Sequence, residues 1–298
     1  MLRRSRRRRT AERGSLCLRR LEQTVDMEAY LHYLAGMTGS ILRNSRRIGA
    51  LAVFQYKLSN KEMFLGRLWK LIMPFVQIGV YWLVFGVGLR NGSPVDGVPY
   101  VVWLVCGITP WFIINSSITK GANAIYSKAT VLSRSNILPH LLPVSAVWAQ
   151  FLNYSWTLLL MLIIFFANGC TLTITALGLF YYLFCALALL SAVSLITSVL
   201  VMLARDFQNV IQMVMRLLFY VSPIFWQGGA LIPGAFQVFD RLNLIAYIIR
   251  GFRYSLLFNT WFFKDLPLLA FFWGAVLLLY LIGAGLQMKL GRNILDYL

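Results

Sequence analysis

The sequence predicts an all-α integral membrane protein with six membrane-spanning helices. Hydrophobic residues make up 59% of the 298 residues and charged residues only 13%, whereas soluble domains have nearer one half and one quarter. Mean hydropathy is +0.70, and long apolar stretches without Asp or Glu recur along the chain. Of the 28 Lys and Arg residues, 15 precede Leu68, which is typical of an N-terminus retained in the cytoplasm.

The N-terminal region 1–40 is expected to be a basic, partly disordered extension. It contains the run "RRSRRRR" at 3–9, and residues 1–26 lack the apolar core of a signal peptide. Met27 is a second plausible start. The net charge of +18 leaves a nucleic-acid-binding arm as an alternative. The positive-inside pattern is favoured, so no nucleic-acid partner is expected.

Residues 41–69 mix basic side chains with Leu51, Phe54, Phe64 and Trp69. This composition predicts an amphipathic helix that lies in the cytoplasmic membrane interface. A solvated linker is the alternative, and it would leave the aromatic rings exposed.

Membrane-spanning helices need roughly 20 mostly apolar residues. A weaker candidate, 210–226, contains Arg216 and Pro223. Six spans would place both termini in the cytoplasm of a multi-pass plasma-membrane protein. The five clear candidates are 71–89, 100–119, 143–167, 176–203 and 266–288.

The segment 227–265 is expected on the outside, although it carries Arg241, Arg250 and Arg253. It is also too apolar for a solvated loop, which predicts re-entrant helices between spans 5 and 6. The three arginines are candidate phosphate contacts near an exit. Lipid headgroups or pairing with Asp240 would explain Arg250 and Arg253 equally.

The sequence lacks the residues that several classes of function require. The chain has two His and four Cys without metal-ligand spacing, so no metal site is expected. No G-x-x-x-x-G-K-[ST] motif occurs, and the apolar stretches hold no carboxylates for ion coupling. Energy for transport must therefore come from a partner. A membrane-embedded lipid- or sugar-transfer enzyme remains the alternative, although its acids would be isolated along the chain.

Candidate residues for a translocation pathway are aromatic side chains within spans and one intramembrane cation. Aromatic faces can stack on sugar rings, but interfacial belts or ordinary packing are the alternatives. The cation could face a cavity or snorkel to the interface. The candidates are Tyr81, Phe85, Trp148, Tyr154, Trp156 and Arg216.

Five stretches, in this order and spacing, resemble the type-2 permease subunits of ATP-binding-cassette exporters for lipid-linked polysaccharides and teichoic acids. The resemblance covers residues 41–298 as one ABC-2 type transmembrane domain, and "VYWLVFGVGLR" is most similar to wall teichoic acid translocation permeases. Two departures occur, at Asn243-Leu244 and Leu138-Pro139, where the family usually has Asn-Pro and Phe-Pro. The stretches are "LGRLWKLIMP" (65–74), "VYWLVFGVGLR" (80–90), "GITPWFIINSSITKGANAIYSKATVLSRSNILPHLLPVS" (107–145), "ARDFQNVIQMVMRLLFYVSPIFW" (204–226) and "LNLIAYIIRGFRYSLL" (242–257).

The resemblance implies a homodimer with two copies of an ATPase subunit docked beneath it. ATP and Mg would bind in that partner, so this chain alone would hold no cofactor and have no enzyme activity. The cargo would be teichoic acid on undecaprenyl diphosphate, exported for cell-wall biogenesis. Lipid-linked O-antigen or capsular polysaccharide is the alternative cargo.

The resemblance also implies short cytoplasmic coupling helices that move with the ATPase. We expect "SKATVLSRSNI", beginning at Ser127, to form one, with Pro139 or Pro143 starting the next span. Its charges satisfy the topology rule as well, so an ordinary inside loop is the alternative. An end-capping ion pair is the alternative for the adjacent Arg205 and Asp206. The predicted coupling residues are Lys128, Val131, Leu132, Arg134, Arg205 and Asp206.

Overall fold

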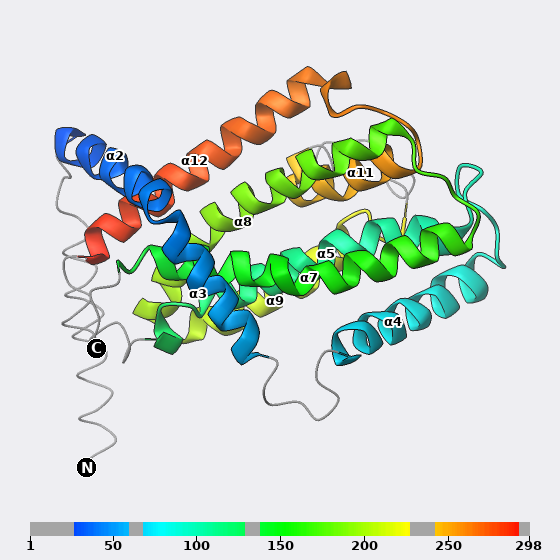
Figure 1. The fold of residues 1–298 in the computed structure, drawn as a ribbon, viewed down its shortest axis with the longest axis horizontal. Helices are drawn as coiled ribbons and strands as arrows, with labels where there is room; N and C mark the ends of the chain where they lie inside the picture. The colour runs from blue at the N-terminus through cyan, green and yellow to red at the C-terminus, as the bar shows by residue number, and fades with distance from the viewer. Residues whose placement is uncertain (1–26, 60–67, 129–137, 227–241, 292–298) are drawn as a thin grey trace, which may run out of the picture.

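The chain folds as a bundle of long helices, shown in Figure 1 as a computed structural model that describes residues 27–59, 68–128, 138–226 and 242–291. The first described helix, α2 (Met27–Arg43), and the end of the last, α12 (Leu266–Gly291), lie at one end of the bundle, here called the termini end, and the opposite end is called the far end (Figure 1). The long helices are α2 (Met27–Arg43), α3 (Ser45–Leu58), α4 (Trp69–Tyr81), α5 (Tyr100–Ala122), α7 (Leu141–Ala167), α8 (Gly178–Leu203), α9 (Asp206–Val221), α11 (Leu244–Leu256) and α12 (Leu266–Gly291). Shorter turns are the π-helix η2 (Trp82–Leu89) and the 3-10 helices η3 (Tyr126–Lys128), η4 (Ile174–Leu177) and η5 (Phe262–Lys264).

Within the residues that the structure describes, five helices are long and apolar enough to cross a membrane. They confirm the all-α membrane class and the five clear spans of the sequence. The sixth predicted span is not confirmed, because α9 has 16 residues and at 1.5 Å per residue reaches only about 24 Å, less than the roughly 30 Å of a hydrocarbon core. The five candidates are Trp69–Leu89, Tyr100–Ala122, Leu141–Ala167, Ile174–Leu203 and Leu266–Lys289.

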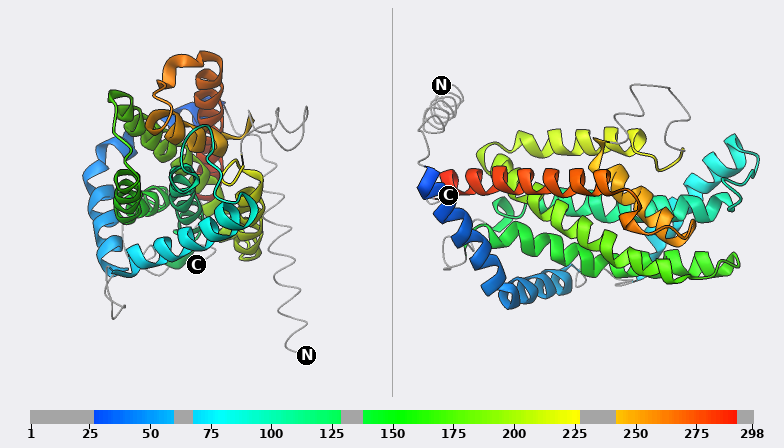
Figure 2. Two further views of the ribbon diagram at one scale, coloured as in Figure 1. Left: turned by 90° about the vertical axis from the view of Figure 1, so that its right-hand side faces the viewer. Right: turned by 90° about the horizontal axis from the view of Figure 1, so that it is seen from above.

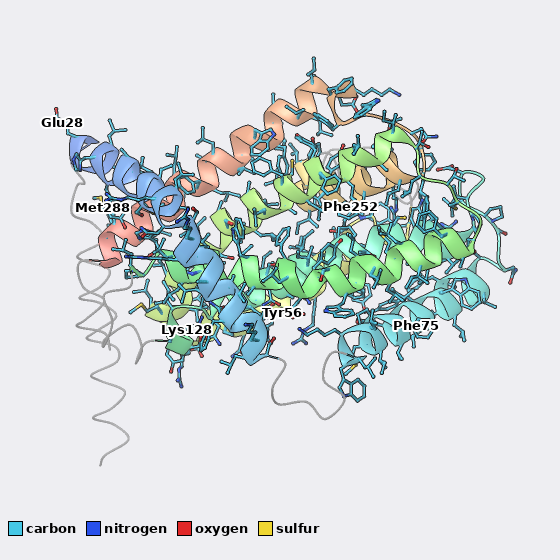
Figure 3. All side chains as sticks on the ribbon, in the orientation of Figure 1. Glu28, Tyr56, Phe75, Lys128, Phe252 and Met288 are labelled. Atoms are coloured by element: carbon cyan, nitrogen blue, oxygen red, sulfur yellow. The ribbon has the colours of Figure 1, made fainter. Side chains whose placement is uncertain are left out.

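The central helix is α5, which packs against α7, α8 and α11 (Figure 2). Of its 23 residues, 17 are buried, including Trp103. By contrast, α4 buries only Ile78, and Phe75 projects from its outer surface (Figure 3). The core of the described part of the chain therefore lies around α5.

At the termini end, α2 and α3 cross the spans at a steep angle (Figure 1). The predicted extension 1–40 includes most of α2, which packs on the end of α12; Tyr30 Oη donates to the Leu281 carbonyl at 2.5 Å. The helix α3 lies along α7 and buries Ile48 and Ala52 while Phe54 is exposed. A helix with one packed and one exposed apolar face is compatible with the predicted interfacial position.

Between α9 and α12, the 13-residue helix α11 is too short to span and is enclosed by α5 and α8. Its N-cap is Asn243, whose side chain accepts from the backbone N–H groups of Ile245 and Ala246. Such a cap satisfies two backbone donors that a helix start otherwise leaves without partners. The helix thus begins without the Asn-Pro pair usual in the family; its re-entrant path stays a prediction.

Candidate functional site

The predicted coupling residues that the structure describes lie together at the termini end. The turn η3 follows α5, and Arg205 lies at the turn between α8 and α9. The Arg205 guanidinium carbon is 4.3 Å from the centroid of the Tyr126 ring, a cation–π contact. Three further predicted residues, Val131, Leu132 and Arg134, fall in 129–137, outside the described residues.

Apolar packing anchors the residues that connect α5 to η3 against α7 and α8. Just before η3, Ala124 and Ile125 are buried in a cluster with Leu142 and Ala146 of α7 and Val199 of α8. Because protein interiors are close-packed and transmit displacement, a push on the following segment would reach α5, α7 and α8 together. The geometry suits mechanical coupling more than chemistry.

This surface carries two cations, Lys128 and Arg205, beside the carboxylate of Asp206. Lys128 is half-buried, and this burial lowers the pKa of its ammonium to about 8; Figure 3 shows it at the lower left of the bundle. Arg205 and Asp206 are exposed. An exposed ion at a helix end is easily reached by a partner protein.

One histidine joins α2 to the start of α7, and sequence reasoning gave it no role. The Ser40 hydroxyl donates to the Met37 carbonyl at 2.8 Å, so its oxygen is left to accept from Nε2 of His140, 2.6 Å away. Burial lowers the pKa of His140 to about 4. The neutral ring is therefore the form that the fold holds.

Two pathway candidates lie in one aromatic cluster. Tyr81 packs its ring 5.1 Å from that of Phe225, and Phe85 stacks on Phe225 at 4.3 Å. The ring of Phe219 on α9 lies 5.5 Å from Tyr81 and 5.3 Å from Trp111 of α5. This cluster joins α4 and η2 to α9 and the turn after it.

The other candidates do not join that cluster. Trp148 on α7 is exposed, whereas Trp156 donates to the Tyr56 hydroxyl of α3 at 3.2 Å and so holds α3 against α7. Tyr154 is buried in the core. Arg216 lies exposed on α9. The three candidates on α7, Trp148, Tyr154 and Trp156, therefore lie on one helix but on different faces of it.

The predicted exit arginines have different environments. Arg241 lies outside the described residues, and Arg250 is half-buried and lines a cavity at the far end. Arg253 is buried at 4% exposure. A side chain so enclosed does not offer its charge to a passing phosphate.

Three backbone carbonyls surround the Arg253 guanidinium. Nη1 donates to Pro223 at 2.6 Å, Nη2 to Ile224 at 2.8 Å and Nε to Trp103 at 3.2 Å. Its carbon also lies 3.4 Å from the centroid of the Trp103 ring. We therefore assign Arg253 a structural role joining α11, α5 and the turn after α9.

Most of the chain matches a known membrane-protein family. The model of the ABC-2 type transporter family matches residues 46–257, a range that contains η3, the Arg205–Asp206 turn, the aromatic cluster and α11. The chain belongs to the ABC-2 type transporter family.

This ABC-2 chain also has curated relatives. An O-antigen export system permease protein of Klebsiella pneumoniae is 24% identical over 223 residues, covering 72% of this chain and 82% of that protein. Its counterpart in Myxococcus xanthus is 26% identical over 172 residues, covering 58% and 65% respectively. A further O-antigen export system permease protein of Klebsiella pneumoniae is 23% identical over 205 residues, covering 66% of this chain and 74% of that protein.

Sequence reasoning missed two features of this ABC-2 permease that depend on distant contacts. Gly107 sits beside Arg253, where a Cβ would lie 2.0 Å from Nη2; the sequence showed only a glycine in an apolar helix. Tyr126 was not singled out, because its partner Arg205 is far away in sequence.

Proposed function

We propose that this ABC-2 chain is the permease subunit of an ATP-driven exporter of lipid-linked polysaccharide. The observation that carries the proposal is the termini-end surface, where the residues just before η3, Ala124 and Ile125, pack against α7 and α8 and Arg205 contacts Tyr126. Together with the family, this surface provides a place where an outside energy source can act. The sequence supplies no nucleotide-binding motif of its own.

The partners follow from this assignment. Two copies of an ABC ATPase would dock on the termini end, which we place in the cytoplasm with both termini of the chain, and they would hold the ATP and Mg. The permease would form a homodimer in the plasma membrane. Exposed apolar side chains on α4 and α9, such as Val76 and Leu217, support burial of these faces by lipid or a second copy.

The cargo would be a polysaccharide on an undecaprenyl diphosphate carrier. The three curated relatives are named as O-antigen export permeases, which supports a glycan cargo. Teichoic acid is the second candidate, favoured by the resemblance of "VYWLVFGVGLR" and by Arg250 and Lys264 at the far end, since cations suit a polyanion.

Co-purification with the ATPase tests the exporter function. We expect a stable complex whose ATP turnover in nanodiscs rises when undecaprenyl-linked glycan is added. Free undecaprenyl phosphate without a glycan serves as the control. ATP turnover that is indifferent to the glycan-bearing lipid, or failure to form the complex, would count against the proposal.

The cargo class is tested by comparing carriers that bear a neutral O-antigen or a teichoic acid. If the cargo is polyanionic, Arg250→Gln with Arg241→Gln should lower stimulation by teichoic acid several-fold more than stimulation by the neutral glycan, because a polyanion depends on both charges whereas a neutral sugar would lose only its hydrogen bonds to Arg250. Equal stimulation of the variant by both carriers would remove the polyanion candidate.

A further inference from the structure

A cavity of about 320 Å³ lies at the far end, between the start of α8, the helix α11 and the segment from η5 to α12. Two buried rings, Tyr182 and Tyr247, line it with centroids 5.5 Å apart. Tyr254, which is 42% exposed, and the half-buried Trp261 also contribute to the lining. The volume falls at the lower end of the range for small-molecule sites.

The absence of a side chain at Gly251 gives the cavity its shape. A Cβ at this position would lie 2.1 Å from Cε1 of Tyr182, so only glycine allows the Tyr182 ring to lie against the α11 backbone. The neighbouring Tyr181 stacks on Phe262 at 4.0 Å, and its hydroxyl is 3.3 Å from that of Tyr247. These contacts hold the aromatic lining in place, and a preorganised site loses less entropy on binding.

Hydrogen-bond donors and hydrogen-bond acceptors both line the same cavity. Arg250 and Lys264 supply donors, Asp265 supplies a carboxylate acceptor, and Thr260 supplies a hydroxyl. A lipid acyl chain would place apolar surface against these charged and polar groups, which is unfavourable. A phosphate group would meet the cations but also the Asp265 carboxylate. Sugar hydroxyls, which both donate and accept, match the whole set.

We propose that this cavity binds a pyranose unit of the exported glycan. The C–H face of a pyranose is apolar and weakly positive, which complements the negative face of a tyrosine or tryptophan ring. The hydroxyls at its edge would bond to Arg250, Thr260 and Asp265. This inference rests on the proposed export function, since only an exported glycan would reach a cavity at the far end, opposite the coupling surface.

Saturation-transfer NMR on the full chain in nanodiscs tests this site. The probes are glucose, galactose, mannose, N-acetylglucosamine and rhamnose, added singly. We expect transfer to the ring protons of at least one sugar, and at least a five-fold loss of that signal in Tyr254→Ala and in Trp261→Ala. Tyr220→Ala, which removes an exposed ring on α9, is the matched control and should keep the signal.

Two results would overturn the proposal: no transfer to any of the five sugars, or a signal that survives both cavity variants. Glycan-stimulated ATP turnover distinguishes failure of the cavity proposal from failure of the exporter function. Stimulation without sugar binding removes the cavity proposal alone, and sugar binding without any ATPase coupling removes the exporter function.

Discussion

At the residue scale, Arg253 connects three segments of the far end that are distant in sequence. Its guanidinium lies against Trp103 of α5 and donates to carbonyls in the Pro223–Ile224 turn. The planar fork of an arginine suits several carbonyls at once, whereas an ammonium does not reproduce this geometry. Gly107 provides the space.

Replacing Arg253 should therefore destabilise the protein. We expect Arg253→Lys to lower the free energy of unfolding by about 2–4 kcal/mol, because buried acceptors lose charge-assisted hydrogen bonds. Gly107→Ala should have an effect of similar size, since the added methyl would collide with the guanidinium. Thermal unfolding in detergent measures both.

The matched control for the glycine is Gly274→Ala in α12, where an added Cβ meets nothing within 4 Å. This variant should unfold at the wild-type temperature or slightly above it, because alanine favours helix. If Gly107→Ala and Gly274→Ala behaved alike, the packed position of Arg253 would be contradicted.

His140 should make stability depend on pH. Its pKa falls from an ordinary value near 6.5 to about 4 in the fold because burial disfavours the charged ring, so the unfolded chain binds the proton more tightly. Stability is then greatest above pH 6.5 and falls as the pH drops toward 4. The full loss is about 3 kcal/mol, at about 1.4 kcal/mol per pKa unit.

Denaturation midpoints measured from pH 7.5 to 4 test this dependence. His140→Asn, which cannot titrate, should flatten the curve in that window. His32→Asn is the control, since that ring lies exposed on α2 and its replacement should leave the slope unchanged. A slope that persists in His140→Asn would locate the titrating group elsewhere.

At the element scale, apolar length predicts most of the spans but not how each helix ends. Residues 210–226 appeared as one span, yet α9 ends at Val221, and Ser222 is extended before Pro223. The residue before a proline is pushed out of the helical region, which explains this end. Similarly, the π-helical turn η2 after α4 has no signal in the hydropathy pattern.

The contact between η3 and the α8–α9 turn should matter for coupling. We expect Tyr126→Ala to reduce polymer export per ATP about two- to five-fold, because an exposed cation–π contact contributes roughly 0.5–1 kcal/mol. Tyr126→Phe keeps the ring and should stay near the wild-type ratio. Export and ATP turnover are measured together in proteoliposomes containing the ATPase.

If Tyr126→Phe were as defective as Tyr126→Ala, the hydroxyl rather than the ring would be responsible. If neither variant changed the ratio, the Arg205 contact would have no part in coupling.

At the scale of the whole molecule, the sequence predicts the membrane class, the family and the five clear spans, whereas the sixth expected span, 210–226, is not confirmed. It does not predict which side chains meet. Trp148, Tyr154 and Trp156 share α7 but occupy an exposed face, the core and the α3 contact. The environment of each of these residues depends on which helices cover that face of α7. Tertiary packing decides this, and the periodicity of one segment does not.

The spans are buried very unequally, which the sequence also conceals. α5 is almost wholly enclosed, while the equally apolar α4 is exposed along most of its surface. Hydropathy cannot separate a helix that faces protein from one that faces lipid, because both are apolar all round. The exposed faces are where a second copy or lipid would pack in the proposed dimer.

We propose that energy enters at the termini end through the segment beginning at η3. The most direct measurement is polymer exported per ATP hydrolysed in proteoliposomes, comparing wild type with the double variant Lys128→Glu and Arg134→Glu. The matched control reverses two exposed charges on α3, Arg46→Glu with Lys57→Glu. We predict that the double variant still hydrolyses ATP but exports at least ten-fold less polymer per ATP, while the control keeps the wild-type ratio. A wild-type ratio in the Lys128/Arg134 variant would contradict the claim.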